Sequence, residues 1–327
     1  MANRRVLIVD DSVMIRRALI EAISRERSLE FVGSAPNGRT ALLKIPLLLP
    51  HVVVLDFDMT EISDREALRA IRQQYPALPV VVLTTPDPDG AAATIEALTL
   101  GASDYVTRPD TQVPSEKALK VFGDEVASKV SVCSPPRAIP RPSWTTQRAA
   151  PTCDRPTVGV TEIPGLAPAK NGAQSLARRA DVVAIGVSTG GPAALMDLLT
   201  TFPADFPVPI LIVQHMPPVF TKLLADRLSA KASIRVAEGR PSQPLLPGHA
   251  WIAPGDFHMA VERSGEVVRI VTNQQPPENS CRPAVDVLFR SVAQVFGQRA
   301  LAVIMTGMGQ DGLRGCADIQ AAGGQVL

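Results

Sequence analysis

Short, uninterrupted aliphatic runs recur along the chain and constrain its fold more than any other feature. The runs VLIV (6–9), VVVL (52–55) and VVVL (80–83) each contain four apolar residues and no polar one. Such runs indicate strands that are buried on both faces, as in a parallel sheet covered by helices. Segments with helical periodicity separate these runs, at residues 13–23, 39–48, 65–74 and 91–100.

Two further short strands are expected at Phe31–Gly33 and Tyr105–Val106, and Gly101 stands where a left-handed helix cap is wanted. Five strand–helix units in succession are typical of a doubly wound parallel sheet. The N-terminal part of the chain is therefore predicted to be a doubly wound α/β domain of (βα)5 type.

The C-terminal part repeats this pattern with different loops. Buried-strand runs occur at 182–187, 209–213 and 300–305, and Pro192 occupies a favoured first helical position. HAWIAP (249–254) and EVVRIV (266–271) are predicted to pair as a β-hairpin, with Ser264-Gly265 near the turn. This part is therefore also predicted to be an α/β domain with a parallel sheet and a β-hairpin.

The segment between the two parts differs in composition. Residues 134–170 contain eight of the 30 prolines and scattered arginines, which is typical of a semi-extended linker. We therefore expect one domain at residues 1–131, a proline-rich linker at 132–178 and a second domain at 179–327.

Composition excludes several classes of protein. The formal net charge of +1 gives no reason to expect nucleic acid as a partner. No run approaches the roughly 18 apolar residues of a membrane span, and the N-terminus does not resemble a signal peptide. The four cysteines show neither metal-ligand spacing nor a disulfide framework. The cytoplasm is the expected compartment, without insertion into a membrane.

Acidic residues follow the predicted strands of the N-terminal part. Asp10 and Asp11 end the first strand and Asp56 the third, while Thr84 and Arg108 end the fourth and fifth. Carboxyl ends of parallel strands meet at one edge of a sheet, and three carboxylates there suit Mg²⁺. This set is suited to hold a phosphoryl group on Asp56. The alternative is that Asp10 and Asp11 only cap the next helix.

The motifs VLIVDDS, VVVLDFDM, VVVLTT and GASDYVTRP resemble the receiver domain of bacterial response regulators over residues 4–122. The resemblance implies that Asp56 accepts phosphate from a histidine kinase, that Asp10 and Asp11 hold Mg²⁺, and that Thr84 reports the phosphorylation. Arg108 stands where the family carries lysine. Thr60 and Asp64 replace a proline and a glycine of the family, and both changes bear on the phospho-switch.

The stretch GVSTGG (186–191) follows a predicted buried strand and admits two interpretations. As a dinucleotide-binding turn it lacks the middle glycine, and Gln214-His215 stands where that motif requires an acidic residue. As a Gly-x-Ser-x-Gly turn it would present Ser188 as a nucleophile at the start of a helix.

A serine nucleophile needs a base and a group that orients the base. His215 ends the strand PILIVQ, and Asp311 lies in the glycine-rich loop TGMGQDG after ALAVI, so all three are expected at one sheet edge. His249 and His258 remain competing bases, and Ser188 in a purely structural turn remains the alternative.

Five motifs of the C-terminal part resemble, in order, the catalytic domain of the chemotaxis protein-glutamate methylesterases: IGVSTGGP, VQHMPPVFTKLLADRL, PGHAWIAPGDFHM, RPAVDVLF and VIMTGMGQDG. The resemblance implies that Ser188 is the nucleophile, that His215 is the general base and acid, and that Asp311 orients the imidazole. Thr189 and the backbone at Met308 would assist the site and the oxyanion.

The resemblance further implies phosphorylation-controlled hydrolysis of glutamyl methyl esters on chemoreceptors, deamidation of receptor glutamines, and no cofactor for the ester chemistry. The unphosphorylated receiver is expected to cover the esterase cleft. The family continues for about thirty residues beyond AAGGQVL, so the catalytic domain is expected to be truncated at its C-terminus. A non-catalytic two-component regulator with a degenerate esterase domain is the alternative function, and a dinucleotide-binding protein is a third.

Overall fold

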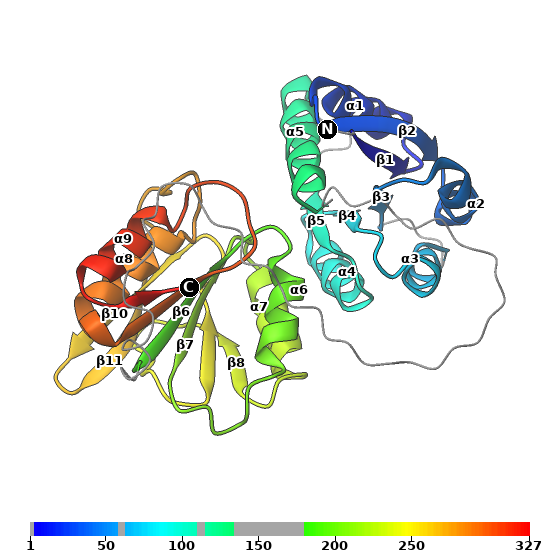
Figure 1. Cartoon of the computed structure of the whole chain (residues 1–327). Helices are drawn as coiled ribbons and strands as arrows, with labels where there is room; N and C mark the ends of the chain where they lie inside the picture. Colours follow the sequence, from blue (N-terminus) through cyan, green and yellow to red (C-terminus); the bar gives the residue numbers. More distant parts are fainter. Residues whose placement is uncertain (1–2, 58–62, 110–114, 134–179) are drawn as a thin grey trace, which may run out of the picture. The chain divides into compact units, whose positions relative to one another are not determined.

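The computed structural model describes residues 3–57, 63–109, 115–133 and 180–327, which form two α/β parts (Figure 1). Nearly all of the predicted linker lies outside the described residues. The last helix of the first part runs through the predicted boundary at residue 131 and ends at Cys133.

Strands and helices alternate in the described residues of the N-terminal part. They are β1 (Arg4–Val9), α1 (Val13–Arg25), β2 (Leu29–Ala35), α2 (Gly38–Leu48), β3 (Val52–Asp56), α3 (Ser63–Gln74), β4 (Val80–Thr84), α4 (Pro88–Thr99), β5 (Asp104–Thr107) and α5 (Glu116–Cys133). The strands pair in parallel in the order β2-β1-β3-β4-β5. This arrangement confirms the predicted doubly wound sheet.

The two faces of this sheet are covered by different helices. Val6 and Ile8 of β1 pack with α1 and α5, while Leu7 and Val9 face α2, α3 and α4. Every residue of β3 and β4 is buried, as their unbroken aliphatic runs predict. Burial of each large aliphatic side chain contributes about 1.5–3 kcal/mol, so these central strands anchor the core.

The predicted helices are confirmed, with small differences at their ends. Helix α4 begins at Pro88 rather than at residue 91, because Oδ1 of Asp87 accepts a hydrogen bond from the Gly90 amide at 2.8 Å. At the other end of α4, Gly101 has a φ of 101°, in agreement with the predicted left-handed cap.

The C-terminal part is built around a larger sheet. Its elements are β6 (Val182–Val187), α6 (Gly191–Leu199), β7 (Ile210–Gln214), α7 (Phe220–Ser229), β8 (Arg235–Glu238), β9 (His249–Ile252), β10 (His258–Ser264), β11 (Val267–Asn273), α8 (Val285–Phe296), the 3-10 helix η2 (Gly297–Arg299), β12 (Ala300–Ile304), α9 (Leu313–Ala321) and β13 (Gln325–Val326). Six strands pair in parallel in the order β13-β12-β6-β7-β9-β8. The predicted parallel-sheet α/β architecture is confirmed.

A β-hairpin is present in this part, but one of its predicted strands is wrong. Residues 249–252 form β9, which joins the main sheet between β7 and β8. The hairpin instead pairs β10 with β11, from His258–Asn273 to Ser264–Val267. The predicted turn is correct, and Gly265 adopts a φ of 63° there. Three of the four residues of β9 are buried, which suits a strand inside a parallel sheet better than a half-exposed hairpin strand.

Among the residues that the structure describes, no helix is both long and apolar enough to cross a bilayer.

Candidate active site

Three polar side chains meet at the carboxyl edge of the C-terminal sheet. Ser188 directly follows β6, His215 directly follows β7, and Asp311 lies in the loop that follows β12. These strands are neighbours in the order β12-β6-β7 and run in parallel, so the residues after them share one edge. The three predicted site residues are brought together by the sheet and not by proximity in sequence.

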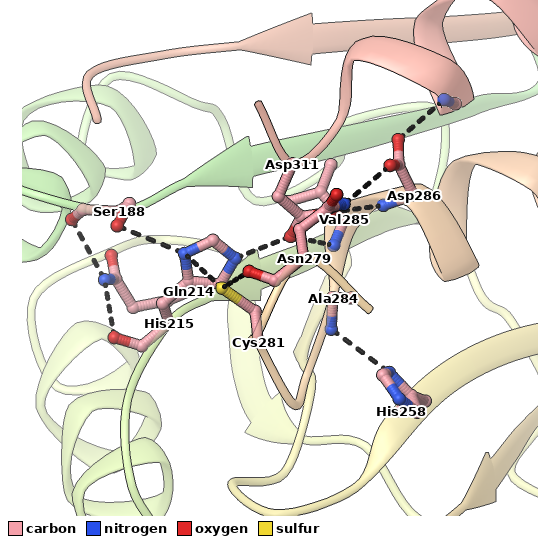
Figure 2. Close-up of polar contacts among 11 residues, drawn as sticks. Ser188, Gln214, His215, His258, Asn279, Cys281, Ala284, Val285, Asp286 and Asp311 are labelled. Carbon is pink, nitrogen blue, oxygen red and sulfur yellow. Dashed lines mark hydrogen bonds and ion pairs between the residues drawn. The ribbon is translucent and has the colours of Figure 1, made fainter. Parts of the chain in front are cut away.

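The imidazole of His215 links the other two side chains (Figure 2). Its Nδ1 lies 3.1 Å from Oγ of Ser188, and its Nε2 lies 2.7 Å from Oδ2 of Asp311. A carboxylate only accepts hydrogen bonds, so Nε2 carries the proton in the neutral ring. The unprotonated Nδ1 then faces the serine hydroxyl as a base.

The glycines of GVSTGG set the position of Ser188. Gly190 has a φ of 73°, which favours glycine, and the Gly191 amide donates to the Ser188 carbonyl at 2.8 Å. A Cβ on Gly191 would lie 1.9 Å from Oε1 of Gln214. The amide of that glutamine donates to the Ser188 carbonyl at 3.0 Å. The sequence therefore presents the serine on a tight strand-to-helix turn.

Asp311 is held by hydrogen bonds from the segment at the start of α8. The backbone amides of Val285 and Asp286 donate to its two carboxylate oxygens at 2.7 and 3.1 Å. Nδ2 of Asn279 donates to its Oδ1 at 3.1 Å (Figure 2). Because these donors fix both oxygens, the carboxylate is oriented toward the His215 ring.

This supporting segment is itself anchored by polar side chains, of which sequence reasoning considered only His258, as a competing base. Asp286 is buried, and it accepts hydrogen bonds from the Gly315 amide at 2.7 Å and from Asn279 at 2.9 Å. The buried His258 accepts a hydrogen bond from the Ala284 amide at 3.2 Å. Asp286 lies inside the motif RPAVDVLF and His258 inside PGHAWIAPGDFHM, whereas Asn279 lies in none of the quoted motifs.

The surroundings of His215 and Asp311 shift the pKa values of both side chains. Burial of His215 disfavours the imidazolium, but the hydrogen bond with Asp311 and the neighbouring Cys281 outweigh it and raise the pKa of His215 to about 9. Burial opposes ionisation of Asp311, but hydrogen bonds from His215 and the amides of Val285 and Asp286 hold its pKa below the usual range. The pair therefore favours an imidazolium beside a carboxylate.

The two competing bases lie elsewhere. His249 begins β9, at the opposite end of the sheet from Ser188, and its Nδ1 lies 2.9 Å from the Pro247 carbonyl. Both nitrogens of His258 are engaged by backbone groups, since Nε2 lies 3.1 Å from the Pro276 carbonyl. Of the three histidines considered, His215 is the one hydrogen-bonded to Ser188.

Thr189 follows Ser188 directly along the chain, at the start of the turn that leads into α6. The Thr189 carbonyl accepts a hydrogen bond from Oγ1 of Thr306 at 2.8 Å. Met308 lies in the loop after β12 and is half exposed. The amide of Ser188 donates to the Thr306 carbonyl at 3.0 Å, so this amide is already used within the fold.

A pocket of about 340 Å³ opens beside His215. It is lined by His215, Met216, Pro217, Pro218, Asp256, Ser280, Cys281, Arg282 and Pro283. Its position next to the imidazole gives a substrate or a small solute access to the reacting groups.

The N-terminal part holds a second polar cluster, at the carboxyl edge of its own sheet. Asp10 and Asp56 are buried and Asp11 is exposed, and one oxygen of each lies within 4.8 Å of the others. One guanidinium nitrogen of Arg108 lies 2.5 Å from Oδ2 of both Asp10 and Asp56. Burial and the nearby carboxylates outweigh this arginine and raise the pKa of Asp10 to about 6. The single positive charge of Arg108 therefore does not neutralise the negative charge of the three carboxylates.

Thr84 completes this edge. Its hydroxyl is buried and lies 2.8 Å from that of Thr94 on α4. Thr60 lies outside the described residues, as does the side chain of Asp64, so the structure gives no account of the altered loop after Asp56. The helix-capping alternative for Asp10 and Asp11 is not what the structure shows, because Ser12 caps α1.

Two parts of the chain match known protein families. Residues 183–327 match the family described as CheB methylesterase, and residues 6–118 match the response regulator receiver domain. A crystal structure of the Thermotoga maritima CheB methylesterase catalytic domain is 40% identical, covers 45% of this chain and 78% of that one, and gives a TM-score of 0.44.

Two curated relatives extend over almost the whole chain. The protein-glutamate methylesterase/protein-glutamine glutaminase of Trichodesmium erythraeum is 47% identical, and the match covers 100% of this chain and 89% of that protein. A protein of the same name from Nocardioides is 40% identical, with 100% and 86% covered. The chain therefore belongs to the protein-glutamate methylesterase/protein-glutamine glutaminase family.

Proposed function

We propose that this chain is a phosphorylation-regulated serine esterase that hydrolyses glutamyl methyl esters on chemoreceptors and releases methanol. The single observation that carries the chemistry is the hydrogen-bonded line from Ser188 through His215 to Asp311. The family supports the substrate, because the curated relatives are named for glutamate methyl ester hydrolysis and glutamine deamidation.

In the first half of the reaction, Oγ of Ser188 attacks the ester carbonyl while Nδ1 of His215 takes its proton. The imidazolium that forms is stabilised by Asp311, whose carboxylate lies 2.7 Å from Nε2. The tetrahedral intermediate then collapses to an acyl-serine. His215 returns the proton to the leaving methoxide, which departs as methanol.

In the second half, water replaces the alcohol. His215 takes a proton from this water, the resulting hydroxide attacks the acyl-serine, and Ser188 leaves with the proton that the imidazole returns. The products are glutamate and free enzyme. With a glutamine side chain as substrate the same steps release ammonia, so one site supports deamidation as well as ester hydrolysis.

The oxyanion of the intermediate requires hydrogen-bond donors. We assign this role to backbone groups near Thr189, which follows Ser188 along the chain, and near Met308, which lies in the loop before Asp311. The amide of Ser188 is not a candidate, because it already donates to Thr306.

The receiver domain is proposed to control this activity through Asp56. The acidic cluster fits Mg²⁺, because it offers carboxylate oxygens from Asp10, Asp11 and Asp56 in a crowded and partly buried setting. When bound, the ion supplies positive charge for a phosphoryl group on Asp56. Arg108 adds a cation against the same carboxylate, and Thr84 lies at the next strand end as the residue that senses the phosphoryl group.

The proposed partners and organisation follow from these assignments. A histidine kinase would supply the phosphoryl group, and methyl-accepting chemoreceptors would be the substrate, both in the cytoplasm. The division into a receiver at 1–131, a linker at 132–178 and an esterase at 179–327 is supported by the family matches at 6–118 and 183–327.

The test is a methanol assay on methylated chemoreceptor membranes, with and without a small acyl phosphate as phosphodonor and Mg²⁺. We expect methanol release that the phosphodonor increases, together with conversion of receptor methyl-glutamate to glutamate by mass spectrometry. A folded chain that releases no methanol under either condition would instead support the non-catalytic regulator.

A further inference from the structure

We propose that Cys281, together with His215, forms a site for a zinc ion that blocks the esterase. Cys281 lies in the segment between β11 and α8, 66 residues from His215 in sequence. Oxygen, nitrogen and sulfur ligand atoms of Asp311, His215 and Cys281 all lie within 4.8 Å of one another. None of the proposed catalytic steps uses the sulfur.

The distances around Nδ1 of His215 fit a tetrahedral ion. Sγ of Cys281 lies 3.8 Å and Oγ of Ser188 lies 3.1 Å from this nitrogen. Zinc bonds of about 2.3 Å to sulfur and about 2.0–2.1 Å to nitrogen or oxygen, at tetrahedral angles, separate such ligands by about 3.6 and 3.3 Å. Both distances from Nδ1 therefore match those between zinc ligands to within a few tenths of an ångström.

Asp311 is better placed to support the ion than to ligate it. Its Oδ2 already accepts the hydrogen bond from Nε2 of His215 at 2.7 Å, on the opposite side of the ring from Cys281 and Ser188 (Figure 2). A carboxylate in this position fixes the tautomer of a zinc-binding histidine and raises its basicity. The same hydrogen bond that prepares Nδ1 as a base therefore prepares it as a ligand.

The chemistry of the donor atoms selects the metal. A thiolate and an imidazole favour zinc over magnesium, which prefers oxygen ligands alone. Cys281 is partly exposed and lines the 340 Å³ pocket, so an ion can reach it from solvent. On binding, the thiol releases its proton to solvent, and Oγ of Ser188 and a water complete the four-ligand coordination.

Zinc at this position removes the base from the reaction. The lone pair of Nδ1 is then used by the metal and cannot take the Ser188 proton. This inhibitory consequence rests on the proposed function, whereas binding of the ion does not.

The binding test uses the full chain, excess Mg²⁺ to fill the acidic cluster of the receiver, and Co²⁺ as a spectroscopic probe for zinc. We expect a thiolate-to-cobalt charge-transfer band in the wild type, which zinc abolishes by displacement. Cys281→Ser should lose the band. Cys316→Ser is the matched control, because this free cysteine lies on α9 outside the cluster, and it should keep the band. A wild type without the band, or a band that survives in Cys281→Ser, overturns the proposal.

A second measurement needs no variant. Zinc should slow alkylation of Cys281 in the wild-type chain, as followed by peptide mass spectrometry, while alkylation of Cys316 proceeds at an unchanged rate. Equal rates for Cys281 with and without zinc overturn the site even if the Cys281→Ser protein does not fold.

The inhibition test measures methanol release as zinc is added, with each variant normalised to its own zinc-free rate. Cys281→Ser should raise the zinc concentration for half-inhibition by at least about tenfold, the loss seen even for outer-shell partners of metal sites. Unchanged zinc sensitivity in Cys281→Ser contradicts the inhibitory role. A chain that shows the cobalt band but no turnover without zinc would retain the metal site and overturn the proposed function instead.

Discussion

His215 contacts Asp311 through Nε2, at 2.7 Å, and this single hydrogen bond leaves Nδ1 as the nitrogen that faces the nucleophile. Burial of the ring lowers the pKa of His215, but this bond and the neighbouring Cys281 outweigh burial and raise the pKa to about 9. The hydrogen bond to Asp311 therefore orients the proposed base and also contributes to its basicity.

The pH dependence of ester hydrolysis follows from this shift. Only neutral His215 can take the serine proton, and below pH 9 the imidazolium predominates. We expect kcat/KM to rise with pH, with an apparent pKa near 9. Asp311→Asn removes the largest contribution that raises the pKa of His215. The rise of kcat/KM should therefore move to lower pH, while its value at high pH falls by about 10⁴. An unchanged apparent pKa in this variant would show that the titrating group is not His215.

Asn279 is expected to act as a positioning residue for Asp311, to which it donates at 3.1 Å. Its φ of 51° lies in the left-handed region, so Asn279→Gly removes the side chain without adding backbone strain. A hydrogen bond to a charged group contributes about 1.5 kcal/mol or more, so kcat should fall by about tenfold or more, with little change in KM.

The control for this variant is Ser280→Gly, at a neighbouring position with a φ of 63°. Ser280→Gly adds the same backbone freedom and removes no contact to Asp311. Its kcat should therefore fall by less than the kcat of Asn279→Gly. A positioning role also predicts that Asn279→Gly shifts the pH profile of kcat/KM, which a purely structural loss would leave in place. Equal losses in the two glycine variants would refute it.

Much of this architecture is encoded in local sequence patterns. The aliphatic runs of β3 and β4 predict their strands because both faces of each strand are covered, and Ser188, His215 and Asp311 could be placed at strand ends. β9 was assigned to the wrong partner because short apolar runs give no information about which strand they join. Asn279 and Cys281 were not recognised, since their partners are distant in sequence and only the folded chain brings them together.

The crowded carboxylates of the receiver should destabilise it when no cation is bound. The pKa of Asp10 is raised from 3.8 to about 6, so the folded receiver binds this proton more tightly than the unfolded chain does. The folded state therefore loses stability as pH rises through that interval. At pH 7 the penalty is about 3 kcal/mol for two pKa units. In metal-free buffer at pH 7, Asp10→Asn should therefore raise the Tm of the receiver transition in calorimetry.

Two further observations check this interpretation. The advantage of Asp10→Asn should disappear near pH 4, and added Mg²⁺ should stabilise the wild type but not the variant. Asp124→Asn is the control, because Asp124 forms an exposed ion pair with Arg25 and should change the Tm little. A lower Tm for Asp10→Asn at pH 7 would mean that the charge on Asp10 stabilises the fold.

Replacement of Asp56 tests the regulatory site. Asp56→Asn keeps the shape of a buried side chain but removes the carboxylate that would accept phosphate. Methanol release should then no longer respond to an acyl phosphate with Mg²⁺, while the release without phosphodonor persists. Asp124→Asn should respond like the wild type. An undiminished response in Asp56→Asn would show that the switch lies at another residue.

The most direct test of the catalytic assignment compares methanol release by the wild type, Ser188→Ala and the double variant Ser188→Ala/His215→Ala. Residues that act as one unit are strongly non-additive, and removal of the nucleophile alone can reduce kcat by about a millionfold. We expect Ser188→Ala to fold normally, to lose nearly all turnover, and to lose no more when His215 is also replaced. The assignment of Ser188 as the nucleophile would be contradicted by a folded Ser188→Ala variant that keeps more than about a tenth of wild-type activity.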